Sequence, residues 1–356
     1  MKEKPLQVAL LFGGRSGEHE VSLRSAASVA AGLLGRHRVL PVLIDKEGRW
    51  WLQQDPRTAA HGGVPVFLVP APDDQGRLRA LQDATVLATP DVYFPVLHGP
   101  YGEDGTLQGL LELAGVPYVG SGVAASAAAM DKELMKALFA AAGVPQVRYR
   151  VLSCRQPDQE KLLPGELGLP LFVKPANLGS SVGVSKVHNE EELGPALDRA
   201  FAFDRKVLVE AGVAARELEV SVLGGHNPEA SLAGEIVPDR EFYDYESKYS
   251  EASRTELRIP APVDEAVATE ARALALRAFA AVDAHGYARV DFFLEQKSGR
   301  LLVNEINTIP GFTSISMYPK LWEASGLAYP DLLGKLLELG LSRHAERALL
   351  RTAYRP

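Results

Sequence analysis

Four polar side chains within two apolar runs are of the types that bind a metal ion and an anion. The runs flank a Lys-Ser-Gly sequence at Ser298, which predicts a tight β-hairpin turn. With the turn centred on Ser298, Asp291 lies opposite Glu305, and Arg289 lies opposite Asn307. Because side chains alternate with a period of two along a strand, all four would share one face of the hairpin.

Such a group of side chains has the chemistry of a cation site. Two carboxylates and an amide oxygen are hard ligands that suit Mg²⁺, whose sites usually keep positions open for substrate phosphates. Asp291, Glu305 and Asn307 are therefore predicted metal ligands. The alternative is a salt-bridged sheet surface, and a register shifted by one residue would send half of the set to the other face.

A glycine- and serine-rich turn is the second candidate, because such turns can cradle phosphates. It lies between predicted strands at Pro170–Lys174 and Gly183–Val187, and it carries Ser180 and Ser181. Its glycines allow close backbone approach, and its N–H and hydroxyl groups are donors. Lys174 ends a buried strand, where an ammonium group needs a partner. The Walker pattern is absent, and a plain hairpin turn is the alternative.

Other polar side chains follow predicted strands, at the edge where open α/β sheets bind ligands. Glu18 follows the strand Gln7–Phe12 and could hold an ammonium group or cap the next helix. His98 follows the strand Val92–Leu97 among glycines that leave room for a ligand, although a lone histidine is more often structural.

Two acidic residues and one turn are weaker candidates for binding a ligand. Glu210 and Glu217 could bind the hydroxyls of a ribose, although such acids are more often solvated. The turn at Pro310-Gly311 offers backbone N–H groups for an oxyanion site, and Ser316 is a further donor nearby.

The elements that must position these residues alternate between strand and helix in the first third of the chain, which favours a parallel sheet with helices on its faces. A hairpin is predicted at Asp45–Leu52, and a helix capped by Asp131 begins a second unit. A third unit holds a long helix at Val263–Val282. Pro238–Thr255 is polar, aromatic and aperiodic, which is typical of a lid.

Composition limits the class of protein. The chain has 356 residues, 46% of them hydrophobic and 23% charged, as in ordinary globular proteins with two or three domains. The formal net charge of −7 gives no basic surface for nucleic acid or an anionic membrane. One cysteine, Cys154, excludes an intramolecular disulfide and fits a reducing compartment. No apolar stretch approaches the roughly 20 residues that span a bilayer, so we expect a cytoplasmic protein.

Taken together, the motifs resemble the ATP-grasp superfamily and, within it, the D-alanine–D-alanine ligases. The resemblance covers nearly all of the chain, and it rests on seven motifs in order: GGRSGEHEVS, LHGPYGEDGTLQG, AAMDKELMK, VKPANLGSSVGVSK, FYDYESKY, ARVDFF and NEINTIPGFTSIS. It implies an α/β, three-unit ATP-grasp architecture. An N-terminal parallel-sheet (pre-ATP-grasp) domain at 1–120 would precede two α+β units, at 121–210 and 211–356, that clamp ATP.

The resemblance also implies roles for residues. The ATP contacts would be Lys132, Lys174, Ser180, Ser181, Glu210, Ala211, Val213, Glu217 and Lys248. Two Mg²⁺ or Mn²⁺ ions would bind Asp291, Glu305 and Asn307. Glu18 would bind the ammonium group of the first D-alanine, linked through Ser180 to Tyr249, with His98 nearby. Arg289 and the Gly311 N–H would stabilise an oxyanion, and Ser316 and Met317 would hold the carboxylate of the second D-alanine.

The implied reaction is the ATP-dependent joining of two D-alanines through an acyl phosphate, for peptidoglycan precursor synthesis, by a homodimer. One departure from the family is the expected adenine hinge, VEAGVAARELE, which changes residues around the backbone contacts. Three alternatives stay open: a ligase that uses D-lactate or D-serine as second substrate, a nucleotide-binding regulatory protein without turnover, and another carboxylate–amine ligase of the same fold.

Overall fold

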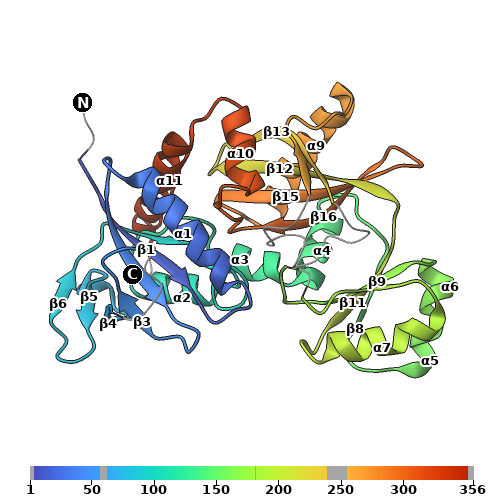
Figure 1. Cartoon of the computed structure of the whole chain (residues 1–356), viewed down its shortest axis with the longest axis horizontal. Coiled ribbons are helices and arrows are strands. Elements are labelled where there is room, and N and C mark those ends of the chain that lie inside the picture. Colours follow the sequence, from blue (N-terminus) through green and yellow to red (C-terminus); the bar gives the residue numbers. More distant parts are fainter. Residues whose placement is uncertain (1–3, 57–61, 181, 239–254, 352–356) are drawn as a thin grey trace.

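The computed structural model describes residues 4–56, 62–180, 182–238 and 255–351. Its ribbon has an N-terminal sheet at one end, a central unit at the other and a C-terminal unit beside both (Figure 1). Nearly all of the predicted lid, including Lys248 and Tyr249, lies outside the described residues, as does Ser181. None of the helices in the described part of the chain has the length and hydropathy needed to cross a membrane.

The N-terminal sheet has seven strands in the order β6-β5-β4-β3-β2-β1-β7. The strands are β1 (Gln7–Gly13), β2 (Arg38–Ile44), β3 (Trp50–Leu52), β4 (Val64–Leu68), β5 (Leu78–Ala80), β6 (Val86–Ala88) and β7 (Val92–Pro95). Its helices are α1 (His19–Leu33) and α2 (Thr106–Leu113), with a 3₁₀ turn at Pro72–Asp74. Alternate residues of β1 face two different cores, with Leu10 and Phe12 in one and Ala9 and Leu11 in the other.

The expectation of a parallel sheet is correct only for part of this sheet. Strand β1 pairs in parallel with β2 and β7, whereas β3 to β6 continue the sheet by antiparallel pairing. The reversal begins at the predicted hairpin, where Asp45 N–H donates to Arg49 O at 2.9 Å. A tight turn needs no crossover helix, so the following strands add without leaving the sheet. The described parts of residues 46–88, whose role was open from the sequence, thus widen the N-terminal sheet.

The central unit is a four-stranded antiparallel sheet in the order β10-β9-β11-β8. Its elements are β8 (Tyr149–Leu152), α5 (Pro157–Glu160), α6 (Leu163–Leu167), β9 (Leu171–Pro175), β10 (Ser185–Val187), α7 (Glu190–Phe201) and β11 (Val207–Ala211). Two helices precede it, α3 (Val123–Met130) and α4 (Lys132–Ala141). The predicted cap of α4 is confirmed, because Asp131 Oδ1 accepts from the N–H groups of Glu133 and Leu134 at 3.1 and 3.2 Å.

The C-terminal unit is a five-stranded sheet in the order β14-β13-β12-β15-β16. Its elements are β12 (Ala215–Gly224), β13 (Glu229–Val237), β14 (Glu256–Arg258), α9 (Glu265–Ala281), β15 (Gly286–Glu295), β16 (Leu301–Asn307), α10 (Met317–Ala324) and α11 (Tyr329–Ala348). Helix α9, which corresponds to the predicted helix at Val263–Val282, packs in one core with β12, β15 and α4.

The end of the chain returns to the N-terminal sheet. Helix α11 lies beside α1 (Figure 1), and its buried Leu333 and Leu336 share a core with Leu10, Phe12 and Phe312. This packing holds the turn after β16 against the carboxyl ends of β1 and β7. The unit boundaries at 120 and 210 stay a prediction.

Candidate active site

The hairpin of β15 and β16 has the register that the sequence predicts for the four polar residues. Asp291 pairs with Glu305, and Arg289 pairs with Asn307. The turn itself is not centred on Ser298. The residue pairs nearer to the turn differ by one residue from those predicted, so that Phe292 pairs with Val303. The register changes between Asp291 and Phe292, which leaves one extra residue, Asn304, on β16. Such β-bulges commonly occur beside active sites, where they redirect side chains.

Arg289 is held by carboxylates on two strands. Its Nε and Nη2 donate to Asp291 Oδ1 and Oδ2, both at 2.6 Å, and its Nε lies 3.1 Å from Glu219 Oε2 on β12. Glu219 is 5% exposed, so this pair is inside the protein. Burial disfavours the charge, but Asp291 and Glu219 raise the pKa of Arg289 well above its ordinary value. The guanidinium is therefore fixed in place and permanently charged. Glu219 was not predicted from the sequence. Its position two residues after Glu217, on the same strand, could have indicated it.

The three predicted metal ligands form a donor set that fits Mg²⁺. Asn307 Nδ2 donates to Asp291 Oδ2 at 3.2 Å, which turns the amide so that its carbonyl oxygen stays available for a cation. Within the described ranges, no three His, Cys, Asp or Glu side chains are grouped closely enough to hold a metal. The third ligand would therefore be the amide oxygen of Asn307. A cation here would compete with Arg289 for Asp291.

The serine-rich turn joins β9 and β10, which are the two predicted strands and pair antiparallel as a hairpin. Gly183 has φ +73°, and a Cβ atom there would lie 2.8 Å from side-chain atoms of both Phe203 and Pro175. Only glycine fits that conformation and that space, so the turn is closed tightly at this end. Ser180 also has a positive φ, of 50°. Residues 176–180 of this turn are called the phosphate loop below.

Two ammonium groups reach this region. Lys132 Nζ, at the start of α4, donates to Leu178 O at 2.6 Å, and burial, only partly offset by Glu305, lowers the pKa of Lys132. Lys174 Nζ lies 2.6 Å from Glu210 Oε2 and 3.4 Å from Asn304 Oδ1. Burial lowers the pKa of Lys174, but Glu210 more than compensates and the net shift is upward. Both predicted phosphate contacts are thus near one loop.

The carboxylate of Glu18 meets the phosphate loop. Ser180 Oγ donates to Glu18 Oε1, and Glu18 is only 9% exposed. A Cβ atom on Gly179 would lie 3.0 Å from Glu18 Oε2, so the two segments are in close contact. Glu18 occupies the cap position of α1, but its side chain makes no capping hydrogen bond, which excludes the capping alternative. The structure thus links the N-terminal sheet and the central unit through these two side chains.

A second buried carboxylate, Glu103, lies beside Glu18 and was missed in the sequence. Gly99 N–H donates to Glu103 Oε1 at 3.0 Å. Burial, then the charge of Glu18, raises the pKa of Glu103 well above its ordinary value, although the Gly99 hydrogen bond and Lys132 oppose the shift. The signal was available, since Glu103 follows a strand end within a glycine-rich loop, as Glu18 does.

His98 connects the N-terminal sheet to the turn that follows β16. Its Nδ1 lies 3.0 Å from Ile309 O, and its Nε2 lies 3.3 Å from Ser25 Oγ. Phe312 N–H donates to the same Ser25 Oγ at 3.2 Å. Burial lowers the pKa of His98, so the neutral ring donates from Nδ1 to Ile309 O and accepts from Ser25 at Nε2. This network fixes the residues on both sides of Gly311.

The residues assigned to the second substrate lie at the start of α10. Ser316 is the cap residue of this helix, and its Oγ is 2.8 Å from Thr313 Oγ1. A Cβ atom on Gly311 would lie 2.7 Å from Ser316 Oγ, so the two are in contact. The Met317 side chain is buried against Ile236, which leaves its backbone N–H as the group that could bind a carboxylate.

The adenine hinge uses Glu210 in an unexpected way. Its carboxylate is 2% exposed and contacts Lys174 and Lys136, so it is not available to a ribose. The N–H group of Ala211 donates to Arg148 O at 2.9 Å, so an adenine base would use other backbone groups of the hinge, such as those of Val213. Glu217 is close enough to Lys174 to raise the pKa of that lysine, and its ribose role stays a prediction.

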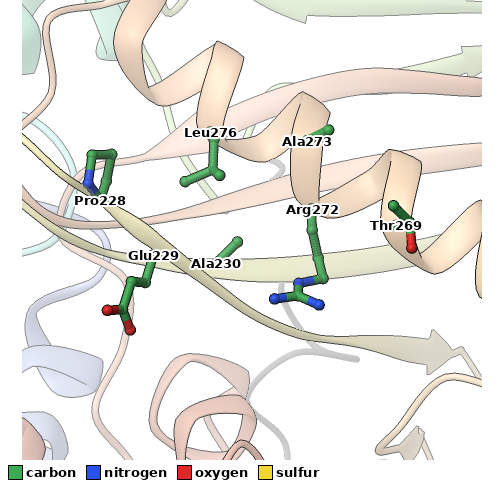
Figure 2. A pocket seen from close by; sticks show the side chains of 7 residues that line it. All are labelled: Pro228, Glu229, Ala230, Thr269, Arg272, Ala273 and Leu276. Carbon is green, nitrogen blue, oxygen red and sulfur yellow. The ribbon is translucent and has the colours of Figure 1, made fainter.

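Residues of β16, of helices α3 and α4, and of the loops at Glu103 and Gly179 line one small cavity. Its volume is about 20 Å³, close to that of one or two water molecules. Its polar lining comprises Glu103, Lys132, Glu305, Asn307 and Thr308. A separate hollow of about 540 Å³ lies between α9 and the start of β13. Figure 2 shows that Arg272 and Glu229 are the charged side chains at its edge, and neither belongs to the site described above.

Comparisons with known proteins show which family the chain matches. The chain matches the family model described as D-ala D-ala ligase N-terminus over residues 7–121, and the one described as D-ala D-ala ligase C-terminus over residues 138–338. A D-alanine–D-alanine ligase of Heliobacterium modesticaldum is 50% identical over 352 residues, which cover 96% of each chain.

Two solved structures are also similar. The D-alanine-D-alanine ligase from Coxiella burnetii has a TM-score of 0.84 at 38% identity, over 96% of this chain and 97% of that one. The VanG D-Ala:D-Ser ligase from Enterococcus faecalis has a TM-score of 0.84 at 32% identity, over 95% of this chain and 100% of that one. The second neighbour shows that a D-serine ligase has the same overall fold.

Proposed function

The chain belongs to the D-ala D-ala ligase family, and from that membership we propose that it joins two D-alanines to D-alanyl-D-alanine, with conversion of ATP to ADP and phosphate. The product would serve peptidoglycan precursor synthesis. The observation that carries the proposal is the contact of Glu18 with Ser180. It places a carboxylate suited to the ammonium group of an amino acid directly on the loop suited to phosphates.

In the first step, the carboxylate of the first D-alanine attacks the γ-phosphorus of ATP, and ADP leaves. Lys132 and Lys174 neutralise charge on the phosphates, and Glu18 orients the substrate through its ammonium group. Asp291, Glu305 and Asn307 would hold Mg²⁺ or Mn²⁺, which when bound would neutralise negative charge during phosphoryl transfer. The product of this step is an acyl phosphate.

In the second step, the amine of the second D-alanine attacks the acyl carbon. The new C–N bond forms, negative charge develops on the carbonyl oxygen, and phosphate leaves as the amine loses a proton. Arg289 and the Gly311 N–H group supply positive charge and a donor to that oxygen. Ser316 and the N-terminal end of α10 would bind the carboxylate of the second D-alanine.

The fold alone does not identify the second substrate, since the Enterococcus faecalis neighbour is described as a D-Ala:D-Ser ligase. We propose D-alanine for this chain because of the lid sequence YDYESKY, which resembles the dipeptide-forming type. A regulatory protein without turnover is disfavoured, because Arg289 and all three predicted metal ligands are present in one register.

The test is phosphate release from ATP with Mg²⁺, in the presence of D-alanine, L-alanine, D-alanine with D-lactate, or D-alanine with D-serine. Products are identified by mass. We expect one phosphate for each D-alanyl-D-alanine and no turnover with L-alanine. Turnover that needs D-lactate or D-serine would reassign the second substrate, and nucleotide binding without D-alanine-dependent turnover would overturn the ligase proposal.

We also propose a cytoplasmic location and a homodimer. The single, exposed Cys154 fits a reducing compartment that contains ATP. Sedimentation at micromolar concentration tests the dimer.

A further inference from the structure

A buried ammonium group that the proposed mechanism does not use lies on α4. Lys136 is 1% exposed and follows Lys132 by four residues, so both lysines lie on one face of the helix. Lys132 reaches the phosphate loop, whereas Lys136 points into the space between α4 and the central sheet. Lysine is almost never fully buried without a compensating partner.

The partner of Lys136 is Glu210. Lys136 Nζ lies 2.9 Å from Glu210 Oε1 in an ion pair, and among the described residues Nζ makes no hydrogen bond of standard geometry. The Nζ atom also lies 5.0 Å from the centroid of the Tyr149 ring, within the range of a cation–π contact. The other oxygen of Glu210 is 2.6 Å from Lys174 Nζ. One buried carboxylate is therefore shared by two ammonium groups, and the three side chains carry one net positive charge.

The two lysines differ in what else they can reach. The Lys174 side chain is 13% exposed and approaches the hairpin at Asn304, whereas the Lys136 side chain is 1% exposed. Burial alone would raise the pKa of Glu210, but the charges of Lys136 and then of Lys174 lower it to about 2. Glu210 thus stays ionised and holds both lysines.

We propose that Lys136 is a positioning residue for nucleotide binding, because it neutralises Glu210 and so allows Lys174 to exchange that carboxylate for a phosphate oxygen. The inference rests on the proposed function, in which ATP lies beside Lys174. If Lys136 were absent, Lys174 would be the sole counter-charge of a buried carboxylate. Moving Lys174 to a phosphate would then leave Glu210 buried and unpaired, which is strongly unfavourable.

The experiment compares three variants by calorimetric titration with a non-hydrolysable ATP analogue and Mg²⁺. Lys136→Met keeps the length of the side chain but removes its charge, so the cluster becomes neutral. Lys136→Met with Glu210→Gln restores one net positive charge, and it buries no unpaired carboxylate. Lys161→Met is the matched control, since Lys161 is in the same unit with a side chain that is 76% exposed.

We expect Lys136→Met to weaken analogue binding about tenfold, because Lys174 is then the only counter-charge of Glu210. The double variant should regain most of that loss, because it has no carboxylate at position 210 to hold Lys174. The control should bind like the wild type. In steady-state assays, KM for ATP should rise in Lys136→Met, while KM for D-alanine stays unchanged.

Two results would overturn the inference alone: wild-type analogue affinity in Lys136→Met, or a double variant that binds no better than the single one. A lower melting temperature with unchanged affinity would show that Lys136 only stabilises the fold. A wild-type protein that binds no nucleotide would instead overturn the proposed function, and the inference with it.

Discussion

Arg289 donates two hydrogen bonds of 2.6 Å to Asp291, so the guanidinium expected at the oxyanion and a carboxylate expected at the metal are paired with each other. Glu219, 3.1 Å from Arg289 Nε, is the second carboxylate on the same group. A cation bound to Asp291 would therefore leave Arg289 with a remaining partner. This arrangement keeps the guanidinium oriented whether or not Asp291 binds a metal.

Arg289→Lys tests the oxyanion role. Lysine keeps the charge but cannot donate from two nitrogens to Asp291 and also contact Glu219, so the charge would be misplaced. We expect kcat for dipeptide formation to fall by about 10²–10³, the usual effect of losing one oxyanion donor. Binding of the ATP analogue should change little. A kcat within about threefold of the wild type would contradict the role of Arg289.

Glu18→Gln tests the first amino-acid site. The variant still accepts a hydrogen bond from Ser180 but loses the negative charge that would hold an ammonium group. We expect KM for the first D-alanine to rise by about tenfold or more, because charged hydrogen bonds are roughly twice as strong as neutral ones. Glu20→Gln is the control, since Glu20 is two residues away in an exposed ion pair with Lys46. Equal KM values in the two variants would remove Glu18 from the site.

Ser25→Ala tests the support of the Gly311 turn. The change removes the hydroxyl that accepts from Phe312 N–H and donates to His98. We expect kcat/KM for the second D-alanine to fall about tenfold or more, because two hydrogen bonds are lost and each contributes roughly 0.5–1.5 kcal/mol. Ser28→Ala is the control, because it removes a hydroxyl hydrogen bond from the same helix to Tyr329 Oη, which involves no polar atom of the turn. Both variants should unfold at similar temperatures, and equal activities would refute the positioning role.

The buried His98 should make the free energy of unfolding depend on pH. Burial is the main cause that lowers its pKa below the ordinary value of 6.5, and Arg289 adds to the shift while Glu18 and the Ile309 carbonyl oppose it. As the pH falls through 6.5, the unfolded chain therefore gains a proton that the folded chain does not. The free energy of unfolding should decrease toward acid, by at most about 1.4 kcal/mol per pH unit for this group.

The measurement is denaturant unfolding at several pH values in the wild type, His98→Gln and His188→Gln. Below pH 6.5, the free energy of unfolding should fall less steeply with decreasing pH in His98→Gln than in the wild type. His188→Gln should behave like the wild type, because His188 is exposed. Identical slopes in the three proteins would show that His98 is not buried in its neutral form. Above the ordinary value of 6.5, the three slopes should be the same.

Local patterns determined much of the site. The period of two along β15 and β16 is a property of any strand, so the pairing of Asp291 with Glu305 could be predicted from spacing alone. These pairs match the prediction although the turn is shifted by one residue, because the bulge at Asn304 restores the register. That compensation depends on packing across the sheet and is not visible in the sequence.

The contacts between distant segments were decided only by the tertiary structure. Strand, helix and turn patterns act over a few residues, whereas Lys136 on α4, Glu210 on β11 and Lys174 on β9 meet only in the folded chain. Glu219 reaches Arg289 only because β12 pairs with β15. Composition and motifs therefore determined the family and most of the polar residues. Which of those residues are partners followed from burial, because an ionised group removed from water is stable only where the fold brings it an opposite charge.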